Sequence, residues 1–262
     1  MPTQPLYSQT ILPIVQRTRE MLLPHFGNTG FRDKQSGATE DIVTELDTRV
    51  EQFFKDEFAK IYPAIPFVGE EYGGNRTSEK FWLVDPIDGT SSFVRGLPFC
   101  TTMVTLVEKG EVIFSVIYDF VNDIMYSAEK GTGAYANGKP IHVSDRPLRQ
   151  ARVAWWANLE NPEQLRAYLS LTKRCHTFHT GASGIEFTMI ASGKLDGTIY
   201  LNPGSKDYDV AAGAFLVSEA GGIVANIGKK TYDYTNISFI AANPIIFGGL
   251  TDGPNAIFPL ES

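Results

Sequence analysis

The sequence lacks several features that define specialised classes of protein. Its only two cysteines, Cys100 and Cys175, lie far apart and form no C-x-x-C pair, so neither a disulfide framework nor a cysteine zinc site is expected. No run of about 18 apolar residues occurs, which excludes a membrane-spanning helix. The N-terminal apolar residues follow no basic stretch, so we expect no secretory signal and a cytoplasmic location.

Positive charge is also scarce. The chain has 23 Lys and Arg against 30 Asp and Glu, a net charge of −7, and no cluster of basic residues, so we expect no nucleic-acid partner. Its 262 residues are 43% hydrophobic, and no linker or repeat divides them, so we expect one domain over residues 1–262. An acidic protein that acts on an anionic substrate needs cations among its own carboxylates.

Hydrophobic spacing predicts helices and strands in alternation. Helical spacing covers residues 6–26 and 41–62, with a polar loop at 27–37 between them. Two β-branched runs separated by Lys109-Gly110 predict a hairpin within an antiparallel sheet. Later strands are expected at 151–156, 196–201 and 221–226, and helices at 162–172, 183–192 and 207–220. This alternation predicts an α/β protein with helices layered on sheets.

Acidic residues gather where predicted strands end. The segment DPIDG at 85–89 follows an apolar strand, and its proline restricts the backbone so that Asp85 and Asp88 can point to one place. Glu70 and Glu71 end the preceding strand, and Asp209 begins a later helix. Such close carboxylates repel one another unless cations lie among them, and oxygen ligands suit Mg²⁺ or Mn²⁺. A simple turn with solvated carboxylates is the alternative.

The residues after this turn suit an anion. Gly89 permits an unusual backbone angle or a close ligand approach, and the segment at 90–92, TSS, is typical of a helix start. The first N–H groups of a helix have no partner within the helix, which favours a bound phosphate. The sequence therefore predicts a phosphate-binding position next to the acidic turn.

Three segments of the chain resemble the signatures of the inositol monophosphatase family, in the family's order. They are GEE at 69–71, DPIDGTSSFVRGLPFC at 85–100 and DYDVAAGAFLVSEAGG at 207–222, and DIVTELD at 41–47 resembles a further family segment. The resemblance implies a five-layer αβαβα sandwich of the inositol monophosphatase and fructose-1,6-bisphosphatase type. It also implies a magnesium-dependent, lithium-sensitive phosphoric monoester hydrolase that acts on a small phosphorylated metabolite and forms a homodimer.

The same resemblance implies a metal ligand set. Glu70, Asp85 and the Ile87 carbonyl would hold one Mg²⁺, and Asp85, Asp88 and Asp209 would hold a second. Glu70 would also help to hold a weaker third ion. Such an arrangement suits a two-metal displacement at phosphorus.

The resemblance further implies the catalytic and substrate-binding residues. Thr90 and Asp47 would orient the attacking water, with Glu70 as the third catalytic residue. The Asp47 carboxylate would accept the Thr90 proton, which leaves the Thr90 oxygen free to accept from water. The residues expected to contact substrate are Asp88, Gly89, Thr90, Gly181, Ala182, Ser183 and Asp209.

One departure from the family pattern affects the substrate. The segment 196–209 is longer than usual, and either Tyr200 or Asn202, depending on the direction of counting, takes the place of the family's inositol-binding glutamate. Neither side chain supplies a carboxylate to sugar hydroxyls. Tyr208 also stands where the family usually has tryptophan. Inositol 1-phosphate is the default substrate, and histidinol phosphate and fructose 1,6-bisphosphate are alternatives.

Two further readings are less favoured. A 3′-nucleotidase of adenosine bisphosphates usually carries a lysine and an acid after DGT, where this chain has Ser91 and Ser92. A non-catalytic regulatory protein would be free to lose the carboxylates, and all of them are present.

The remaining conspicuous residues are interpreted as structural. Cys100 follows an apolar segment and is expected to be buried and unreactive. Lys34 is left outside the predicted site because its spacing differs from that of a family lysine. The four histidines have no metal-ligand spacing, and the aromatic pairs are expected to pack in the core or an interface; these are His25, His142, His176 and His179, with Phe53-Phe54 and Trp155-Trp156.

Overall fold

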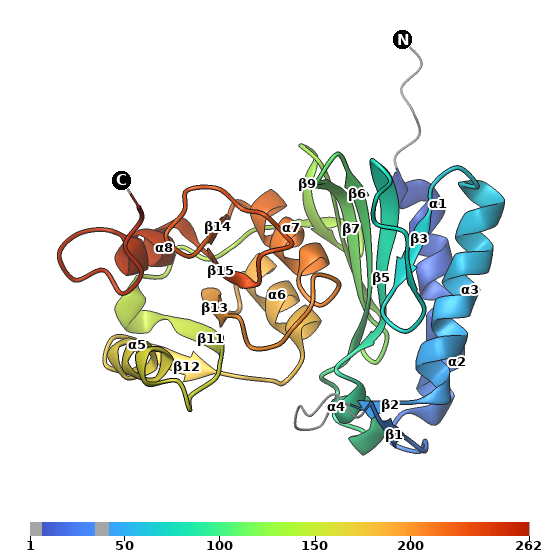
Figure 1. Ribbon diagram of the computed structural model, residues 1–262, viewed down its shortest axis with the longest axis horizontal. Helices are drawn as coiled ribbons and strands as arrows, with labels where there is room; N and C mark the ends of the chain where they lie inside the picture. Colours follow the sequence, from blue (N-terminus) through green and yellow to red (C-terminus); the bar gives the residue numbers. More distant parts are fainter. Residues whose placement is uncertain (1–6, 35–41, 262) are drawn as a thin grey trace, which may run out of the picture.

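The computed structural model describes residues 7–34 and 42–261, which form two main sheets separated and flanked by helices (Figure 1). The N-terminal helical segment is divided into α1 (Tyr7–Gln16), α2 (Thr18–Leu22) and the 3₁₀ turn η1 (Leu23–His25). A single helix over 6–26 was predicted. Arg17 N instead bonds to Ile14 O at 3.1 Å, a tighter turn that interrupts the α-helix.

The helix that follows carries one of the predicted site residues. β1 (Arg32–Asp33) pairs with β2 (Ile42–Val43), and α3 (Glu45–Ile61) begins directly afterwards. Thr44 caps α3: its hydroxyl accepts from Leu46 N, and Asp47 accepts from Thr44 N. The start predicted at 41 lies outside the described residues.

The larger sheet has eight strands in the order β10-β9-β8-β7-β6-β5-β3-β4. Most of its pairings are antiparallel, as the sequence predicted, and β3 pairs with β5 in parallel. α1 and α3 cover one face, where Trp82, Phe54 and Phe58 are fully buried. The strands are β3 (Phe67–Gly69), β4 (Gly73–Gly74), β5 (Lys80–Asp88), β6 (Thr101–Glu108), β7 (Glu111–Asp119), β8 (Ile124–Glu129), β9 (Gly133–Ala136) and β10 (Lys139–Ile141).

The smaller sheet has five strands in the order β12-β11-β13-β15-β14. Two helices, α6 (Ser183–Ala191) and α7 (Ala211–Glu219), lie between the sheets (Figure 1). They pack closely because Gly213 has no side chain: a Cβ there would lie 2.0 Å from the Phe187 ring. The strands are β11 (Arg152–Ala157), β12 (His176–Phe178), β13 (Gly197–Leu201), β14 (Ile223–Asn226) and β15 (Ser238–Ala242).

The outer face of the smaller sheet is covered by α5 (Pro162–Thr172) and α8 (Pro244–Thr251), with the 3₁₀ turn η2 (Leu148–Gln150) beside them. The layers therefore run helix, sheet, helix, sheet, helix, and the predicted αβαβα class is confirmed. β15 and α8 were not predicted, and α7 begins at Ala211 rather than 207. Among the described residues, no helix is long and apolar enough to cross a membrane.

Candidate active site

A cavity of about 300 Å³ opens where β5 and α4 (Thr90–Arg95) of the larger sheet face the N-terminus of α6 and the loop before α7. Its lining draws on segments far apart in sequence. The lining residues are Lys34, Glu70, Asp85, Ile87, Asp88, Gly89, Thr90, Ser91, Trp156, Gly181, Ser183, Gly204, Ser205, Lys206, Tyr208 and Asp209. The predicted metal ligands therefore lie around one cavity. A larger groove is lined by residues within 13–24, which belong to the N-terminal helices and the turn η1, together with Asp123.

The end of β5 aims two carboxylates into the cavity. The pairing of β5 with β6 shifts register between Asp85 and Asp88, and Thr102 Oγ1 donates to Pro86 O at 2.9 Å, which fixes the irregular backbone. Asp88 accepts from Ser183 N at 3.1 Å and Gly184 N at 2.9 Å, at the first turn of α6. Asp85 Oδ1 is buried and has no hydrogen-bond partner among the residues that the structure describes.

Burial and mutual repulsion disfavour the charged carboxylates. Burial first, then the neighbouring Glu70 charge, raise the pKa of both Asp85 and Asp209 well above the usual range. Burial raises the pKa of Asp88 to about 6, against the effect of its hydrogen bonds. Burial raises that of Glu70 to about 7. Carboxylates in this condition gain stability from a nearby cation.

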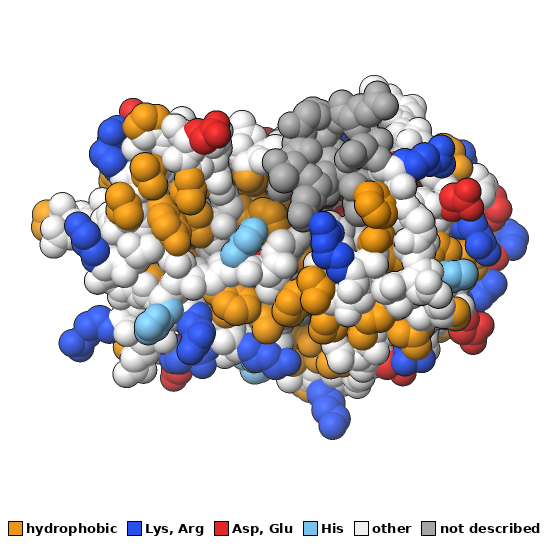
Figure 2. Space-filling model, turned by 90° about the horizontal axis from the view of Figure 1, so that it is seen from below, with side chains coloured by type: hydrophobic (Ala, Val, Ile, Leu, Met, Phe, Trp, Pro, Cys, Tyr) orange, Lys and Arg blue, Asp and Glu red, His pale blue; other side chains and the backbone are white. Residues whose placement is uncertain are grey.

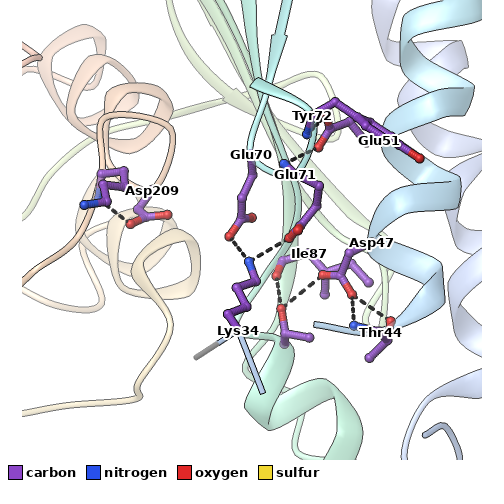
Figure 3. A network of polar contacts seen from close by, with 11 residues as sticks. Lys34, Thr44, Asp47, Glu51, Glu70, Glu71, Tyr72, Ile87 and Asp209 are labelled. Carbon is purple, nitrogen blue, oxygen red and sulfur yellow. Dashed lines mark hydrogen bonds and ion pairs between the residues drawn. The ribbon is translucent and has the colours of Figure 1, made fainter. Parts of the chain in front are cut away.

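Lys34 supplies a cation to this cluster. Its Nζ lies 2.6 Å from Glu70 Oε1 and 2.6 Å from Glu71 Oε1, and Figure 3 shows the lysine between the two acids. Burial disfavours the ammonium, but the two carboxylates outweigh that effect and raise the pKa of Lys34. The sequence interpretation left Lys34 outside the site. The position of Lys34 in the sequence did not indicate a place in the site, because the pairing of β1 with β2 decides where this residue lies.

The chemistry of the lining residues suits a hard divalent ion. The cavity presents four carboxylates, and among the described residues the buried Asp85 Oδ1 has no hydrogen-bond partner. Within the described residues, no three His, Cys, Asp or Glu side chains already surround one point at metal-ligand distance. Asp209 accepts from Lys206 N at 2.6 Å and stands across the cavity from Glu70 (Figure 3). Side-chain rotation would be needed for these residues to share an ion.

Asp47 lies behind the cavity lining and contacts Thr90, which is a lining residue. Thr90 Oγ1 lies 2.8 Å from Ile87 O and 3.2 Å from Asp47 Oδ1. Asp47 is fully buried and also accepts from Thr44 N and Oγ1, at 2.8 and 2.6 Å. Burial raises the pKa of Asp47, against these hydrogen bonds. One carboxylate thus joins the cap of α3 to the first residue of α4.

Glu51 is a supporting carboxylate that the sequence interpretation missed. It is fully buried and accepts from Glu71 N at 2.7 Å and Tyr72 N at 2.9 Å, which fixes the chain leaving β3. Gly69 makes room for it, since a Cβ there would lie 2.0 Å from Glu51 Oε1. The helical pattern did not indicate that Glu51 is buried, because an acidic residue within an amphipathic helix is usually exposed to solvent.

Backbone geometry brings Gly89 against the opposite half of the molecule. Gly89 has φ +78°, and a Cβ would lie 2.3 Å from Phe99 O and 2.9 Å from Ala182 Cβ. Gly181 and Ser183 line the cavity, whereas Ala182 is buried behind Gly89 and does not. Of the predicted contact segment at 181–183, Gly181 and Ser183 therefore form part of the cavity wall, and Ala182 packs behind it.

The residues at the missing glutamate position do not replace it. Tyr200 is fully buried, and Asn202 is exposed with φ +47° and is not among the lining residues. Trp156 lines the cavity instead, while Trp155 packs in the core. The prediction that both tryptophans serve packing alone is thus corrected for Trp156, which reaches the cavity from the end of β11.

Figure 2 shows one outer face of the molecule, on which few acidic side chains of the described residues appear. Seen from below, the middle of the face carries mostly hydrophobic and basic side chains, and acidic ones lie near its margins (Figure 2). Asp85 and Asp88 are only 2% and 6% exposed. These two carboxylates are therefore held inside the protein and away from bulk solvent.

Comparison with known proteins identifies the family of this arrangement. A model described as the inositol monophosphatase family matches residues 8–252. The chain is 31% identical to inositol monophosphatase 1 of Mus musculus over 234 residues, 84% of each protein. It is 30% identical over 240 residues to a Thermotoga maritima protein named fructose-1,6-bisphosphatase/inositol-1-monophosphatase, covering 90% of each. The solved structure of a Thermotoga maritima IMPase superposes with a TM-score of 0.84 at 28% identity, covering 92% of this chain and 93% of that one.

Proposed function

The chain belongs to the inositol monophosphatase family and is a phosphoric monoester hydrolase, and we propose that it hydrolyses a small polyol or sugar phosphate with Mg²⁺ as cofactor. Inositol 1-phosphate is the default substrate. The observation that carries the proposal is the buried, unpaired Asp85 Oδ1 among three further carboxylates of one cavity. Such a cluster is costly unless cations neutralise it.

The proposed metal ligands follow the family pattern. Glu70, Asp85 and the Ile87 carbonyl would hold one ion, Asp85, Asp88 and Asp209 a second, and Glu70 would contribute to a third; Mn²⁺ is the alternative metal. When bound, the ions would lower the pKa of the attacking water and stabilise the leaving oxygen. The proposal is supported by the raised pKa values of these carboxylates, whose common and largest cause is burial.

Thr90 and Asp47 are proposed to orient the water. The Thr90 hydroxyl has one proton, which it can donate either to Ile87 O or to Asp47, and its lone pairs then accept from water. The N–H groups of Gly89 and Thr90 are proposed to hold the phosphate at the start of α4. Ser183 and Gly181, across the cavity, are proposed to contact the leaving group.

An assay of phosphate release tests this function. The substrates are inositol 1-phosphate, fructose 1,6-bisphosphate, histidinol phosphate and 3′-phosphoadenosine 5′-phosphate, each with Mg²⁺, with EDTA, and with Mg²⁺ plus Li⁺. We expect Mg²⁺-dependent, Li⁺-sensitive release from inositol 1-phosphate. Release from one of the next two substrates alone would favour the alternative supported by the missing glutamate. No release from any of them would contradict the proposal.

We also propose an assembly, from the family pattern, and a location, from the two unpaired cysteines and the N-terminal sequence. The protein would act as a cytoplasmic homodimer in which residues 1–262 form one domain. Sedimentation equilibrium of the purified protein tests the dimer, with a mass of about twice 28.9 kDa as the expected result.

A further inference from the structure

A row of aromatic rings crosses the smaller sheet and ends at the cavity. Trp156 of β11, Tyr200 of β13 and Phe239 of β15 are partners in the strand register. The Trp156 and Tyr200 rings are parallel within 10° with centroids 5.3 Å apart, and those of Tyr200 and Phe239 within 7° at 4.7 Å. Tyr200 and Phe239 are fully buried, whereas Trp156 is half-buried and lines the cavity. The aromatic row thus presents the Trp156 side chain to the cavity, whose lining also includes Tyr208.

Glu186 of α6 holds this indole in place. The Trp156 Nε1–H donates to Glu186 Oε2, and Glu186 Oε1 accepts from Thr180 N at 2.7 Å and Thr180 Oγ1 at 3.0 Å. Glu186 is fully buried, so each of these contacts is made away from solvent. Glu186 therefore fixes two walls of the cavity together, the indole on β11 and the chain that enters Gly181.

The chemistry around Trp156 differs from that of the carboxylate cluster. The lining carboxylates are Glu70, Asp85, Asp88 and Asp209, all in the proposed metal set. Outside that set, the described lining offers Ser183, Ser205, Lys206 and Tyr208, whose side chains donate hydrogen bonds and include no carboxylate. A leaving group rich in hydroxyls would find few acceptors there, while a flat ring would find a fixed aromatic surface.

We propose that Trp156 is a specificity-determining residue whose indole packs against a ring of the leaving-group alcohol, and that an aromatic ring is favoured over a polyhydroxylated one. Glu186 is the positioning residue that keeps the indole in the cavity. This inference rests on the proposed phosphomonoesterase function and shifts its preferred substrate from the default inositol 1-phosphate to phosphate esters of alcohols that carry an aromatic ring.

The test compares two esters of primary alcohols that differ in the ring, 2-phenylethyl phosphate and glycerol 3-phosphate, with Mg²⁺. In Trp156→Ala we expect kcat/KM to fall about fivefold to tenfold for the phenylethyl ester and to stay within about twofold for the glycerol ester. Trp156→Phe, which keeps a ring, should restore most of the phenylethyl activity. Equal effects on both esters, or no effect on either, would overturn the proposal.

Glu186→Gln tests the positioning role, with the exposed Glu160→Gln as its matched control. We expect Glu186→Gln to raise KM for the phenylethyl ester severalfold with little change in kcat, and Glu160→Gln to change neither constant. A merely structural role would instead lower kcat for both esters in parallel with the melting temperature.

A binding measurement tests this inference independently of the proposed phosphatase activity. Calorimetry with 2-phenylethylphosphonate and methylphosphonate, both resistant to hydrolysis, is carried out on the Mg²⁺-loaded protein. A phenylethyl affinity that falls about fivefold or more in Trp156→Ala, with methylphosphonate unchanged, supports the proposal even if no ester is hydrolysed. Equal affinities in the two proteins overturn it, and failure to hydrolyse either ester contradicts only the proposed phosphatase function.

Discussion

Asp47 Oδ1 lies 3.2 Å from Thr90 Oγ1, which joins the first turn of α3 to the first residue of α4 across 43 positions of sequence. Asp47 also closes the capping box of α3 with Thr44. The geometry of the proposed water-binding pair is therefore coupled to the start of a helix on the far side of the larger sheet. A substitution of Asp47 should therefore affect both the stability of α3 and the catalytic activity.

The Thr90 hydroxyl is predicted to be essential while its methyl group is not. Thr90→Val keeps the shape but removes the proton donor, so we expect kcat to fall by a factor of about 10² or more. Thr90→Ser keeps the hydroxyl and should retain most of the activity. Steady-state kinetics of both variants on the preferred substrate, with melting temperatures as a check on folding, measures this. A Thr90→Val enzyme of near normal kcat would contradict the role.

Asp209→Asn is predicted to abolish activity without unfolding the protein. Because Asp209 is one of several buried carboxylates that repel one another, its neutralisation should leave the metal-free melting temperature unchanged or higher. Mg²⁺ should raise the melting temperature of the unmodified protein more than that of the variant, since a ligand stabilises only the state that binds it. Thermal unfolding with Mg²⁺ and with EDTA compares the two. Equal Mg²⁺ stabilisation would remove Asp209 from the ligand set.

Lys34 is predicted to compete with a divalent ion for Glu70. Lys34→Met removes the ammonium 2.6 Å from Glu70 Oε1 and leaves that carboxylate free to turn toward a metal. We expect the half-saturating Mg²⁺ concentration to fall severalfold and the metal-free protein to lose stability, because Glu70 and Glu71 then repel each other. Titration calorimetry and melting in EDTA measure the two effects. The exposed Lys173→Met serves as the control. Weaker Mg²⁺ binding in Lys34→Met would mean that the lysine assists the metal.

Gly184→Ala is predicted to disturb Asp88 through simple crowding. A Cβ at Gly184 would lie 2.2 Å from Thr101 Oγ1 and 3.0 Å from Asp88 Oδ2, so either the α6 terminus or the carboxylate must move. Overpacking of this kind costs about 1 to 3 kcal/mol. We expect lower stability by chemical denaturation and a loss of activity larger than that in Gly221→Ala, whose site has open space but a φ of +88°. Full activity in Gly184→Ala would show that Asp88 need not be held at this point.

Glu186 is predicted to make folding stability depend on pH. Burial raises its pKa to about 7, so the folded state holds the proton more tightly than the unfolded state, whose carboxyl titrates near 4.5. The contribution to stability is therefore complete at acid pH and is lost as pH rises from about 4.5 through 7, on the order of 3 kcal/mol. Denaturant unfolding at pH 5 and pH 8 should show a smaller pH dependence in Glu186→Gln. The same slope in both proteins would refute this.

The sequence predicted helices and strands most accurately where they depend on patterns of neighbouring residues. The strand before Asp85, the hairpin at Lys109-Gly110 and helix α5 follow from alternation, turn residues and helical spacing. The first helix was predicted as continuous because its apolar spacing continues across the break at Arg17, where a single tighter turn decides the outcome. β15 and α8, which complete the smaller sheet and its outer layer, were not predicted.

The sequence by itself determined the family, the layered fold class and the carboxylates of the candidate site, because these depend on motifs that are contiguous along the chain. Only the tertiary structure decided that Lys34 pairs with Glu70, that Glu51 fixes the exit of β3, and that Trp156 reaches the cavity. Each of these depends on the register of strands or on a side chain from a distant element. Spacing along the sequence carries no information about such contacts, since folding brings the partners together from segments that are not neighbours.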